Sequence, residues 1–263
     1  MTNNVNEKNI DRFDGYSELY HSGRPNPPEI ILKSALMYAP ANPQVVVDIG
    51  CGTGLSTQLW KDTAETIIGI DPNEDMLSEA GRSVVAANIS FKKGISNDTG
   101  LPDNYADIVT VAQAFHWFDI DNTLTEVYRI LKPGGVLAIY DYDNPPSVDW
   151  VVEKACLQFR DKGNAICAAQ AEPVTRTDKN SFIKILNAFG KFSFVKEIVC
   201  HSEEIGPAEK IIGFSLSQGY AQDALKFDPS FQREIDVFCD AVRSRLSGEC
   251  PILFSYRLRL AVK

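Results

Sequence analysis

The sequence lacks the cysteine and histidine patterns that hold metal ions. Its three histidines form no H-E-x-x-H motif, and no cysteine belongs to a C-x-x-C pair, so no metal site is expected. Cysteines scattered in this way indicate a reducing compartment, and we predict a cytoplasmic protein. The six cysteines lie at positions 51, 156, 167, 200, 239 and 250.

Long apolar runs and an excess of basic residues are also missing. No stretch approaches the roughly 18 apolar residues that cross a bilayer, and the segment MTNNVNEKNIDRF lacks the apolar core of a signal peptide. The net charge of −9 argues against a surface that binds phosphate backbones. Neither a membrane nor a nucleic acid is therefore expected as a partner. The 263 residues, 44% of them hydrophobic, suit one α/β domain with an insertion.

The stretch VVVDIGCGTGLST, residues 45–57, has the composition of a ligand-binding turn. The apolar run Val45–Ile49 predicts a buried parallel strand, and Leu55–Lys61 predicts the first turns of a helix. Three glycines alternate between them, which allows a sharp turn and the close approach of a ligand. A tight turn without a ligand is the alternative, although one glycine would suffice for it. The residues of this turn are Gly50, Cys51, Gly52, Thr53 and Gly54.

The spacing of these glycines limits the classes of ligand that the turn could bind. A dinucleotide fingerprint reads G-x-G-x-x-G, whereas here the third glycine comes one residue early, at Gly54. No Lys-Ser/Thr pair follows, which excludes a P-loop. Asp48 is expected at the strand end, facing the glycines. An acidic lip suits a ligand that carries an amine and hydroxyls better than one that carries phosphates.

A second strand is expected over Thr66–Ile70, and it ends in Asp71. An acid at this place, about 20 residues past the glycines, binds ribose hydroxyls in such folds. Alternatively, Asp71 caps a helix that starts at Pro72. Met76, one turn further on, lies against an adenine ring or in the core.

Three motifs in this order resemble the class I S-adenosylmethionine-dependent methyltransferases. They are VVDIGCGTG, GIDPNEDML and GISNDTGLPDNYADIVTVAQAFHWFD, and the third resembles the small-molecule branch with the trans-aconitate methyltransferase-like enzymes. The resemblance covers roughly residues 13–140. It implies S-adenosylmethionine as cofactor and a Rossmann-like sheet of seven strands, mostly parallel with an antiparallel last strand. Helices would cover both faces, and a helical cap would enclose the site.

The resemblance also implies contacts from outside the glycine turn. Tyr20 and Arg24 match a leader that folds over the cofactor, where Arg24 would pair with the methionyl carboxylate. The alternative is a packing helix with an exposed arginine. Ser96 and Asn97 stand where the family shows Ala-Glu beside the adenine, and Asn97 keeps a side-chain carbonyl.

A fourth strand is expected over Ala106–Ala112, and its end should open on the cofactor crevice. Ligands of open α/β sheets bind outside the carboxyl ends of the strands, which brings Gln113, His116 and Trp117 to the mouth. His116 is the first candidate for a catalytic base. The alternatives are a histidine bonded to the backbone and, for Trp117, a core aromatic.

We predict three parts: residues 1–40 as a leader or lid, 41–142 as the cofactor-binding core, and 143–263 as a part with cap helices and the last two strands. Helices are expected over residues 148–160, 181–189, 208–220 and 228–246, with a polar, irregular stretch at 161–180. We expect the substrate pocket to be lined by Tyr16, His116, Trp117, Ser215, Ser217 and Tyr220. For the cap residues Ser215, Ser217 and Tyr220, the alternative is a solvated helix face.

The predicted function is methyl transfer to a small molecule, with a carboxylic acid as the first choice of acceptor. A carboxylate is ionised at neutral pH and needs no base, whereas a hydroxyl or amine would need one. The alternatives are such a hydroxyl or amine, a protein or RNA acceptor, and a nucleotide-binding module without activity. A monomer or homodimer is expected.

Overall fold

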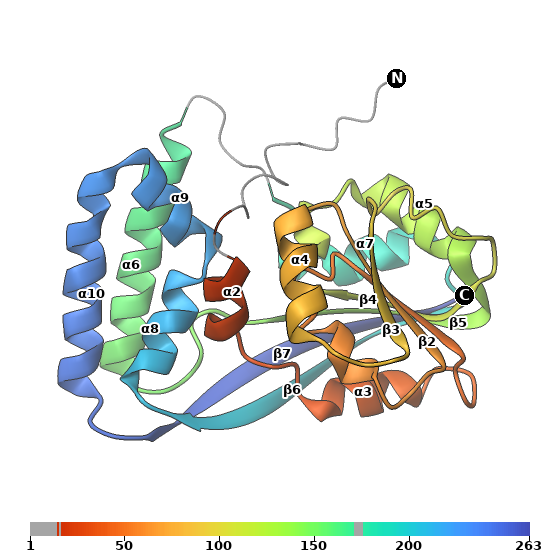
Figure 1. The fold of residues 1–263 in the computed structure, drawn as a ribbon, viewed down its shortest axis with the longest axis horizontal. Helices are drawn as coiled ribbons and strands as arrows, with labels where there is room; N and C mark the ends of the chain where they lie inside the picture. Colours follow the sequence, from red (N-terminus) through yellow and green to blue (C-terminus); the bar gives the residue numbers. More distant parts are fainter. Residues whose placement is uncertain (1–14, 16, 171–175) are drawn as a thin grey trace.

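The computed structural model describes residue 15 and residues 17–170 and 176–263, and its centre is a seven-stranded sheet. The strand order is β3-β2-β1-β4-β5-β7-β6, and only β7 runs antiparallel to its neighbours among these strands. The predicted fold class is therefore confirmed. The strands are β1 (Val45–Ile49), β2 (Thr66–Asp71), β3 (Ile89–Lys93), β4 (Ala106–Ala112), β5 (Leu131–Tyr142), β6 (Phe194–Gly206) and β7 (Cys250–Val262) (Figure 1).

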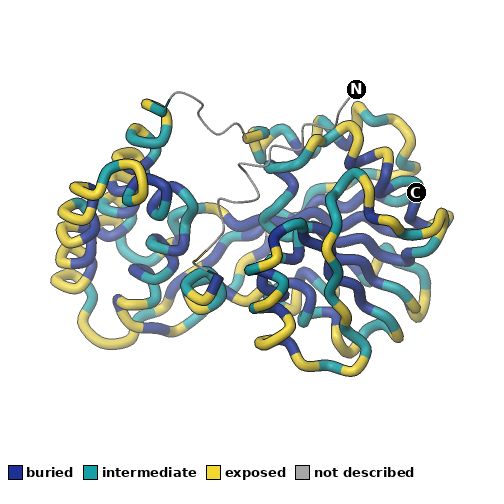
Figure 2. Tube along the Cα trace, turned by 45° about the horizontal axis from the view of Figure 1, so that its top comes forward, coloured by how far each residue is buried: buried dark blue, intermediate teal, exposed yellow. Residues whose placement is uncertain are grey.

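Helices cover both faces of the sheet because the central strands are apolar on both sides. Neighbouring residues of β1 enter different cores: Val46 packs with α3 (Glu29–Leu36), and Val47 packs with α5 (Ile120–Ile130) and α7 (Phe182–Phe189). This alternation follows from the two-residue repeat of a strand. Figure 2 shows the resulting buried sheet beneath half-exposed helices, and α4 (Glu74–Ser83) packs against β3.

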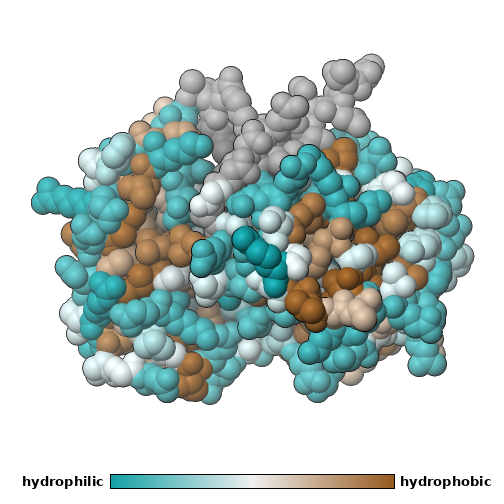
Figure 3. Space-filling model, viewed as in Figure 1, coloured by the Kyte–Doolittle hydropathy of each residue, from teal (hydrophilic) through white to brown (hydrophobic). Residues whose placement is uncertain are grey.

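A group of helices forms a cap at one end of the sheet. It consists of α6 (Trp150–Ala168), α8 (Ala208–Leu216), α9 (Gly219–Phe227) and α10 (Gln232–Arg245), and the long strands β6 and β7 lead to it (Figure 1). The leader helix α2 (Ser17–Gly23) packs on α8, so closely that a Cβ on Gly23 would lie 2.6 Å from the Gly213 carbonyl oxygen. Figure 3 shows hydrophobic patches among hydrophilic residues on both parts. Among the described residues, no helix combines the length and apolarity needed to cross a membrane.

The predicted helix over Leu55–Lys61 is wrong, because the chain forms the short 3-10 helix η1 (Thr57–Trp60) instead. Thr57 and Trp60 are three residues apart and both fully buried. A 3-10 turn brings residues at this spacing onto one side. The Thr57 hydroxyl also donates to Asp48 at 2.7 Å, which ties the turn to the end of β1.

The helix after β2 begins later than predicted. Asn73 is its N-cap and accepts a hydrogen bond from the Met76 amide at 2.9 Å, so Pro72 lies before the helix. Asp71 does not cap this helix. Its side chain accepts hydrogen bonds from the backbone amides of Gly52 and Asn73. The bond to Gly52 ties Asp71 to the loop between β1 and η1.

Two predicted boundaries in the cap are also wrong. The helix α6 continues to Ala168 through part of the stretch expected to be irregular, because its later turns still pack on α9: a Cβ on Gly163 would lie 2.9 Å from the Tyr220 side chain. The single helix predicted over residues 208–220 is two helices, α8 and α9. They separate at Ser217, whose hydroxyl bonds back to the Phe214 carbonyl at 2.8 Å.

Candidate functional site

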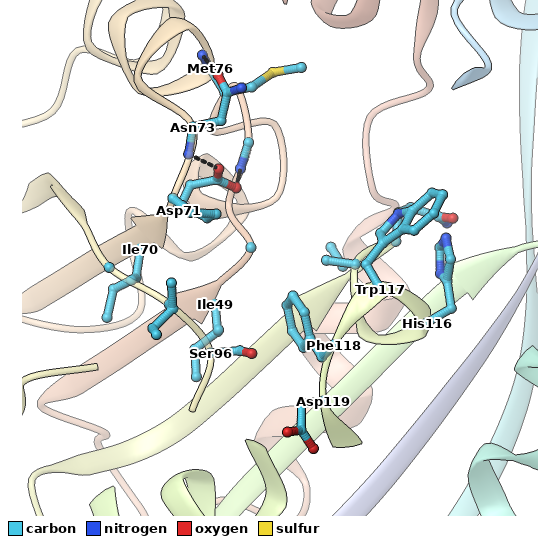
Figure 4. A pocket seen from close by; sticks show the side chains of 18 of the residues that line it. Ile49, Ile70, Asp71, Asn73, Met76, Ser96, His116, Trp117, Phe118 and Asp119 are labelled. Atoms are coloured by element: carbon cyan, nitrogen blue, oxygen red, sulfur yellow. Dashed lines mark hydrogen bonds between the residues drawn. The ribbon is translucent and has the colours of Figure 1, made fainter. Parts of the chain in front are cut away.

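A cavity of about 510 Å³ opens at the carboxyl ends of β1, β2 and β4. At this point the sheet order reverses, since β2 lies on one side of β1 and β4 on the other. Crevices at such switch points bind ligands in open α/β sheets. Figure 4 shows Asp71 and Met76 on one side of the cavity, facing Trp117, His116 and Phe118 across open space.

The three glycines of the loop serve different purposes. A Cβ on Gly50 would lie 2.6 Å from the Ala114 Cβ, and one on Gly54 would lie 2.8 Å from the Val84 side chain. Both positions are therefore glycine because of packing. Gly52 has a φ of 53° and lines the cavity. A Cβ added to it would have no heavy atom within 4 Å. The space beside Gly52 is thus open to a ligand.

Asp71 is the acidic group of the cavity wall. Its carboxylate accepts hydrogen bonds from the backbone amides of Gly52 and Asn73, both at 2.9 Å. Burial raises the pKa of Asp71 to about 6, and the two amide donors oppose this rise. These donors leave lone pairs of the carboxylate for further hydrogen bonds. A ligand with hydroxyl donors fits this arrangement.

Asp48 does not form the predicted acidic lip. Its side chain is fully buried behind the loop and lines neither cavity. Burial raises the pKa of this carboxyl to about 7, while the hydroxyl of Thr57 opposes the rise. Cys51 and Thr53 are buried as well, and they lie outside the cavity wall with Gly54. No local pattern sets the direction of these side chains, which the packing turns inward.

The far end of the cavity contains the loop after β3. Ser96 shares a hydrogen bond with Thr123 at 2.8 Å, so its hydroxyl is already engaged. The Asn97 Oδ1 is buried and has no hydrogen-bond partner among the described residues. Met76 is 3% exposed and lies in the wall. The residues predicted to bind the cofactor that line this cavity are Tyr20, Gly50, Gly52, Asp71, Pro72, Met76, Ser96, Asn97, Ala112, Gln113 and Trp117.

The short helix η2 (Phe115–Trp117) forms the opposite wall. The rings of His116 and Trp117 have centres 4.7 Å apart, and the Arg176 guanidinium lies 5.0 Å from the ring centre of Trp117. The Thr177 amide donates to the His116 carbonyl at 3.0 Å. The segment from Arg176 onward is thereby attached to the end of β4.

A second cavity of about 360 Å³ adjoins the first. The two share a wall of Tyr20, Gln113, His116, Trp117, Arg176 and Thr177. The second cavity has five basic side chains against three acidic ones, although the chain as a whole carries −9. The basic residues are Arg24, Arg160, Arg176, Lys179 and Arg257, and the acidic ones are Asp141, Asp143 and Asp178.

Arg24 lies in this second cavity and not in the first. Its guanidinium donates to the Tyr142 hydroxyl and, at 2.8 Å, to the Ser217 carbonyl. The aromatic ring of Tyr20 lies 4.4 Å from its guanidinium carbon. The alternative of an exposed arginine is wrong, because Arg24 holds the leader helix against β5 and the α8–α9 connection.

The cap contributes fewer of the predicted substrate residues than expected. Tyr220 lines the second cavity, whereas Ser215 and Ser217 are buried in packing and line neither cavity. Tyr16 lies outside the described residues. Sequence reasoning missed Arg160, Lys179 and the other charged residues from β5, α6, η3 (Lys179–Ser181) and β7. They belong to no motif, and only the fold brings them together.

Comparisons with known proteins agree with this geometry. A family model described as a methyltransferase domain matches residues 47–139. An uncharacterized methyltransferase of Mycobacterium tuberculosis strain H37Rv is 34% identical over 143 residues, which are 54% of this chain and 56% of that protein. Residues 47–139 of this chain are thus similar to a methyltransferase domain. The matched domain holds β1 to β5 almost entirely, and with them the glycine loop, Asp71 and η2.

One further sequence relative and one solved structure are also similar to this chain. A demethylmenaquinone methyltransferase of Symbiobacterium thermophilum is 36% identical over 143 residues, 44% of this chain and 56% of that protein. The chain thus spans about half the length of these curated relatives. A solved structure from Anaeromyxobacter dehalogenans, whose assignment as a type II methyltransferase is provisional, has a TM-score of 0.67 at 21% identity. The match covers 91% of this chain and 97% of the chain in that structure, which shows that the two share a fold. Membership of the trans-aconitate methyltransferase-like branch stays a prediction.

Proposed function

We propose that the protein transfers a methyl group from S-adenosylmethionine to a small molecule, with the cofactor in the first cavity and the acceptor in the second. The observation that carries this proposal is the wall that the two cavities share. Methyl transfer is an in-line displacement, in which acceptor atom and methyl carbon must meet at one point. Two adjoining cavities, each lined by its own polar groups, provide such a point.

The residues of the first cavity fit the cofactor. The open space beside Gly52 admits a ligand close to the backbone. Asp71 offers carboxylate lone pairs to ribose hydroxyls, and the Asn97 Oδ1 can accept from an amino group such as that of adenine. When bound, the cofactor supplies an activated methyl group on sulfur. The protein then needs mainly to align the acceptor and exclude water.

The charges of the second cavity support a carboxylic acid as acceptor. An excess of basic groups in a partly enclosed cavity attracts an anion despite the acidic balance of the whole chain. A carboxylate acceptor is ionised at neutral pH and needs no general base. The small size of the cavity, about 360 Å³, supports a small molecule over a protein or RNA. The relative named as a demethylmenaquinone methyltransferase also has a small molecule in its name.

A hydroxyl or amine acceptor is the second candidate, and His116 favours it. His116 lies in the shared wall and is 8% exposed, so it is within reach of both cavities. An imidazole in this place can take a proton from a hydroxyl or an ammonium group. The two candidates therefore differ in whether transfer requires His116.

Labelled methyl transfer tests the proposal. The purified protein is incubated with S-adenosylmethionine labelled on the methyl group and with a panel of small acids, phenols and amines. We expect label in acids, and we expect S-adenosylhomocysteine, but not NAD, to raise the melting temperature, because a ligand that binds only the folded state stabilises it. Stabilisation by NAD alone would contradict the assignment of S-adenosylmethionine as cofactor. Label in amines alone would contradict a carboxylic acid as acceptor.

A further inference from the structure

Gln113 occupies the point where the two cavities meet, and its backbone conformation is unusual. It follows the last residue of β4 and has a φ of 55°, a left-handed value that side-chain-bearing residues rarely adopt. The backbone N–H of Gln113 donates to the Tyr140 carbonyl at 3.0 Å, which fixes this backbone conformation against β5. Strained conformations of this kind cluster at binding sites. Gln113 lines both cavities.

The orientation of the Gln113 amide is set by Lys179. The Lys179 ammonium lies 3.1 Å from the Gln113 Oε1. An ammonium group can only donate, so the oxygen of the amide must face Lys179 and the nitrogen must face away. The Gln113 Nε2 is buried and finds no hydrogen-bond partner among the described residues. A buried N–H donor without a partner is unfavourable, and an oxygen atom of a ligand would satisfy it.

Lys179 is itself held in place by a network of charges. Its ammonium lies 3.7 Å from one carboxylate oxygen of Asp141, whose other oxygen accepts from Arg259. The Arg259 side chain is fully buried, and it bonds to Glu197 at 2.7 Å and to the Lys179 carbonyl at 3.1 Å. Three strands, β5, β6 and β7, are thus linked to the short helix η3. The network keeps the ammonium at the Gln113 amide.

We propose that Gln113, oriented by Lys179, recognises an oxygen atom of the acceptor and selects acids over amines. This inference rests on the proposed function and names the atom that would receive the methyl group. In the transfer, a carboxylate oxygen forms the bond to the methyl carbon while the carbon–sulfur bond breaks and its electron pair stays on sulfur. The product is an ester, and no proton moves. A protonated amine has only N–H donors and would meet the donor Nε2 beside an ammonium group.

The substitution Gln113→Glu inverts the hydrogen-bonding character of this point at nearly constant shape. One oxygen of the new carboxylate still pairs with Lys179, and the other presents an acceptor where Nε2 presented a donor. In protein saturated with S-adenosylhomocysteine, ligand-observed NMR would compare matched triplets of acid, amide and amine, starting with benzoate, benzamide and benzylamine. We expect acids to bind about tenfold or more weakly in the variant, the loss expected for a charged hydrogen bond, and amines to gain.

Gln218→Glu is the charge-matched comparison, because Gln218 lines the second cavity away from the junction. It should weaken acids less than Gln113→Glu does and give amines a smaller gain. Lys179→Met should abolish the preference for acids over amides, and Lys179→Arg should restore part of it. Lys184→Met removes a charge at an exposed position of α7 and should leave the preference for acids over amides unchanged. Affinity for S-adenosylhomocysteine and the melting curve report whether each variant is folded.

Two results would overturn the proposal. One is a wild-type protein that binds acids no better than their matched amides, including one that binds neither. The other is an unchanged preference for acids in both folded Gln113→Glu and Lys179→Met. If S-adenosylhomocysteine fails to bind, the titrations are repeated without it. The proposed cofactor would then be wrong, while acid selection at Gln113 would still be decided.

Discussion

The substitution Gly52→Val separates the shape of the loop from its ligand. A Cβ at this position meets no heavy atom within 4 Å, so the larger side chain enters the open cavity and not the packed interior. The backbone φ of 53° makes any side chain unfavourable here, by about 1–2 kcal/mol. The protein should therefore fold with somewhat lower stability, while the side chain occupies the space that we assign to the cofactor.

Gly248 offers a matched control for the backbone strain. Its φ is 76°, no heavy atom lies within 4 Å of a Cβ, and it lines neither cavity. Gly248→Val should thus also cost about 1–2 kcal/mol, roughly 2–8 °C in melting temperature for a chain of this size. Any difference between the two variants in ligand response then comes from the cavity.

Thermal melting with and without S-adenosylhomocysteine measures the difference. At about 100 times its dissociation constant, a ligand stabilises the folded state by about 2.7 kcal/mol, which corresponds to a rise of several degrees. We expect this rise in the wild type and in the Gly248→Val control, and no rise in Gly52→Val. An equal rise in Gly52→Val would refute the assignment of the open space to the ligand.

The remaining predictions concern the two buried carboxyls and the histidine. Asp71→Ala should weaken binding of S-adenosylhomocysteine by roughly 1.5–3 kcal/mol and Asp71→Asn by less; isothermal titration that gives wild-type affinity for both would exclude a role in ribose binding. Since the pKa of Asp71 is about 6, wild-type affinity should fall as the pH drops below this value, and Asp71→Asn should flatten the fall. The pKa of Asp48 rises from 3.8 to about 7 on burial, so the protein loses stability as the pH rises through this interval, by up to about 4 kcal/mol. Asp48→Asn should raise the free energy of unfolding more at about pH 8 than at about pH 4, and urea titrations with equal differences at both would contradict this. His116→Ala should leave single-turnover methyl transfer to an acid nearly unchanged; a loss of about a hundredfold or more would indicate a hydroxyl or amine acceptor.

The sequence by itself determined the core of the fold and the place of the first cavity. Short apolar runs rich in β-branched residues, such as Val45–Ile49 and Thr66–Ile70, favour buried strands of a parallel sheet, and their order with the intervening turns favours one topology. The glycine loop and Asp71 follow such strands directly, so their position at the sheet edge is a local property of the chain. For this reason β1, β2 and β4 lie where they were expected.

The tertiary structure alone decided which side chains face the cavities. Asp48 is next to the glycine loop in sequence, yet Thr57 and the surrounding packing turn it into the interior. Arg24 and Lys179 come from segments far apart in the sequence and still line one cavity. Such convergence leaves no periodic or local signal, because it depends on how the cap, the leader and the sheet pack together. The basic second cavity could therefore be found only from the folded chain.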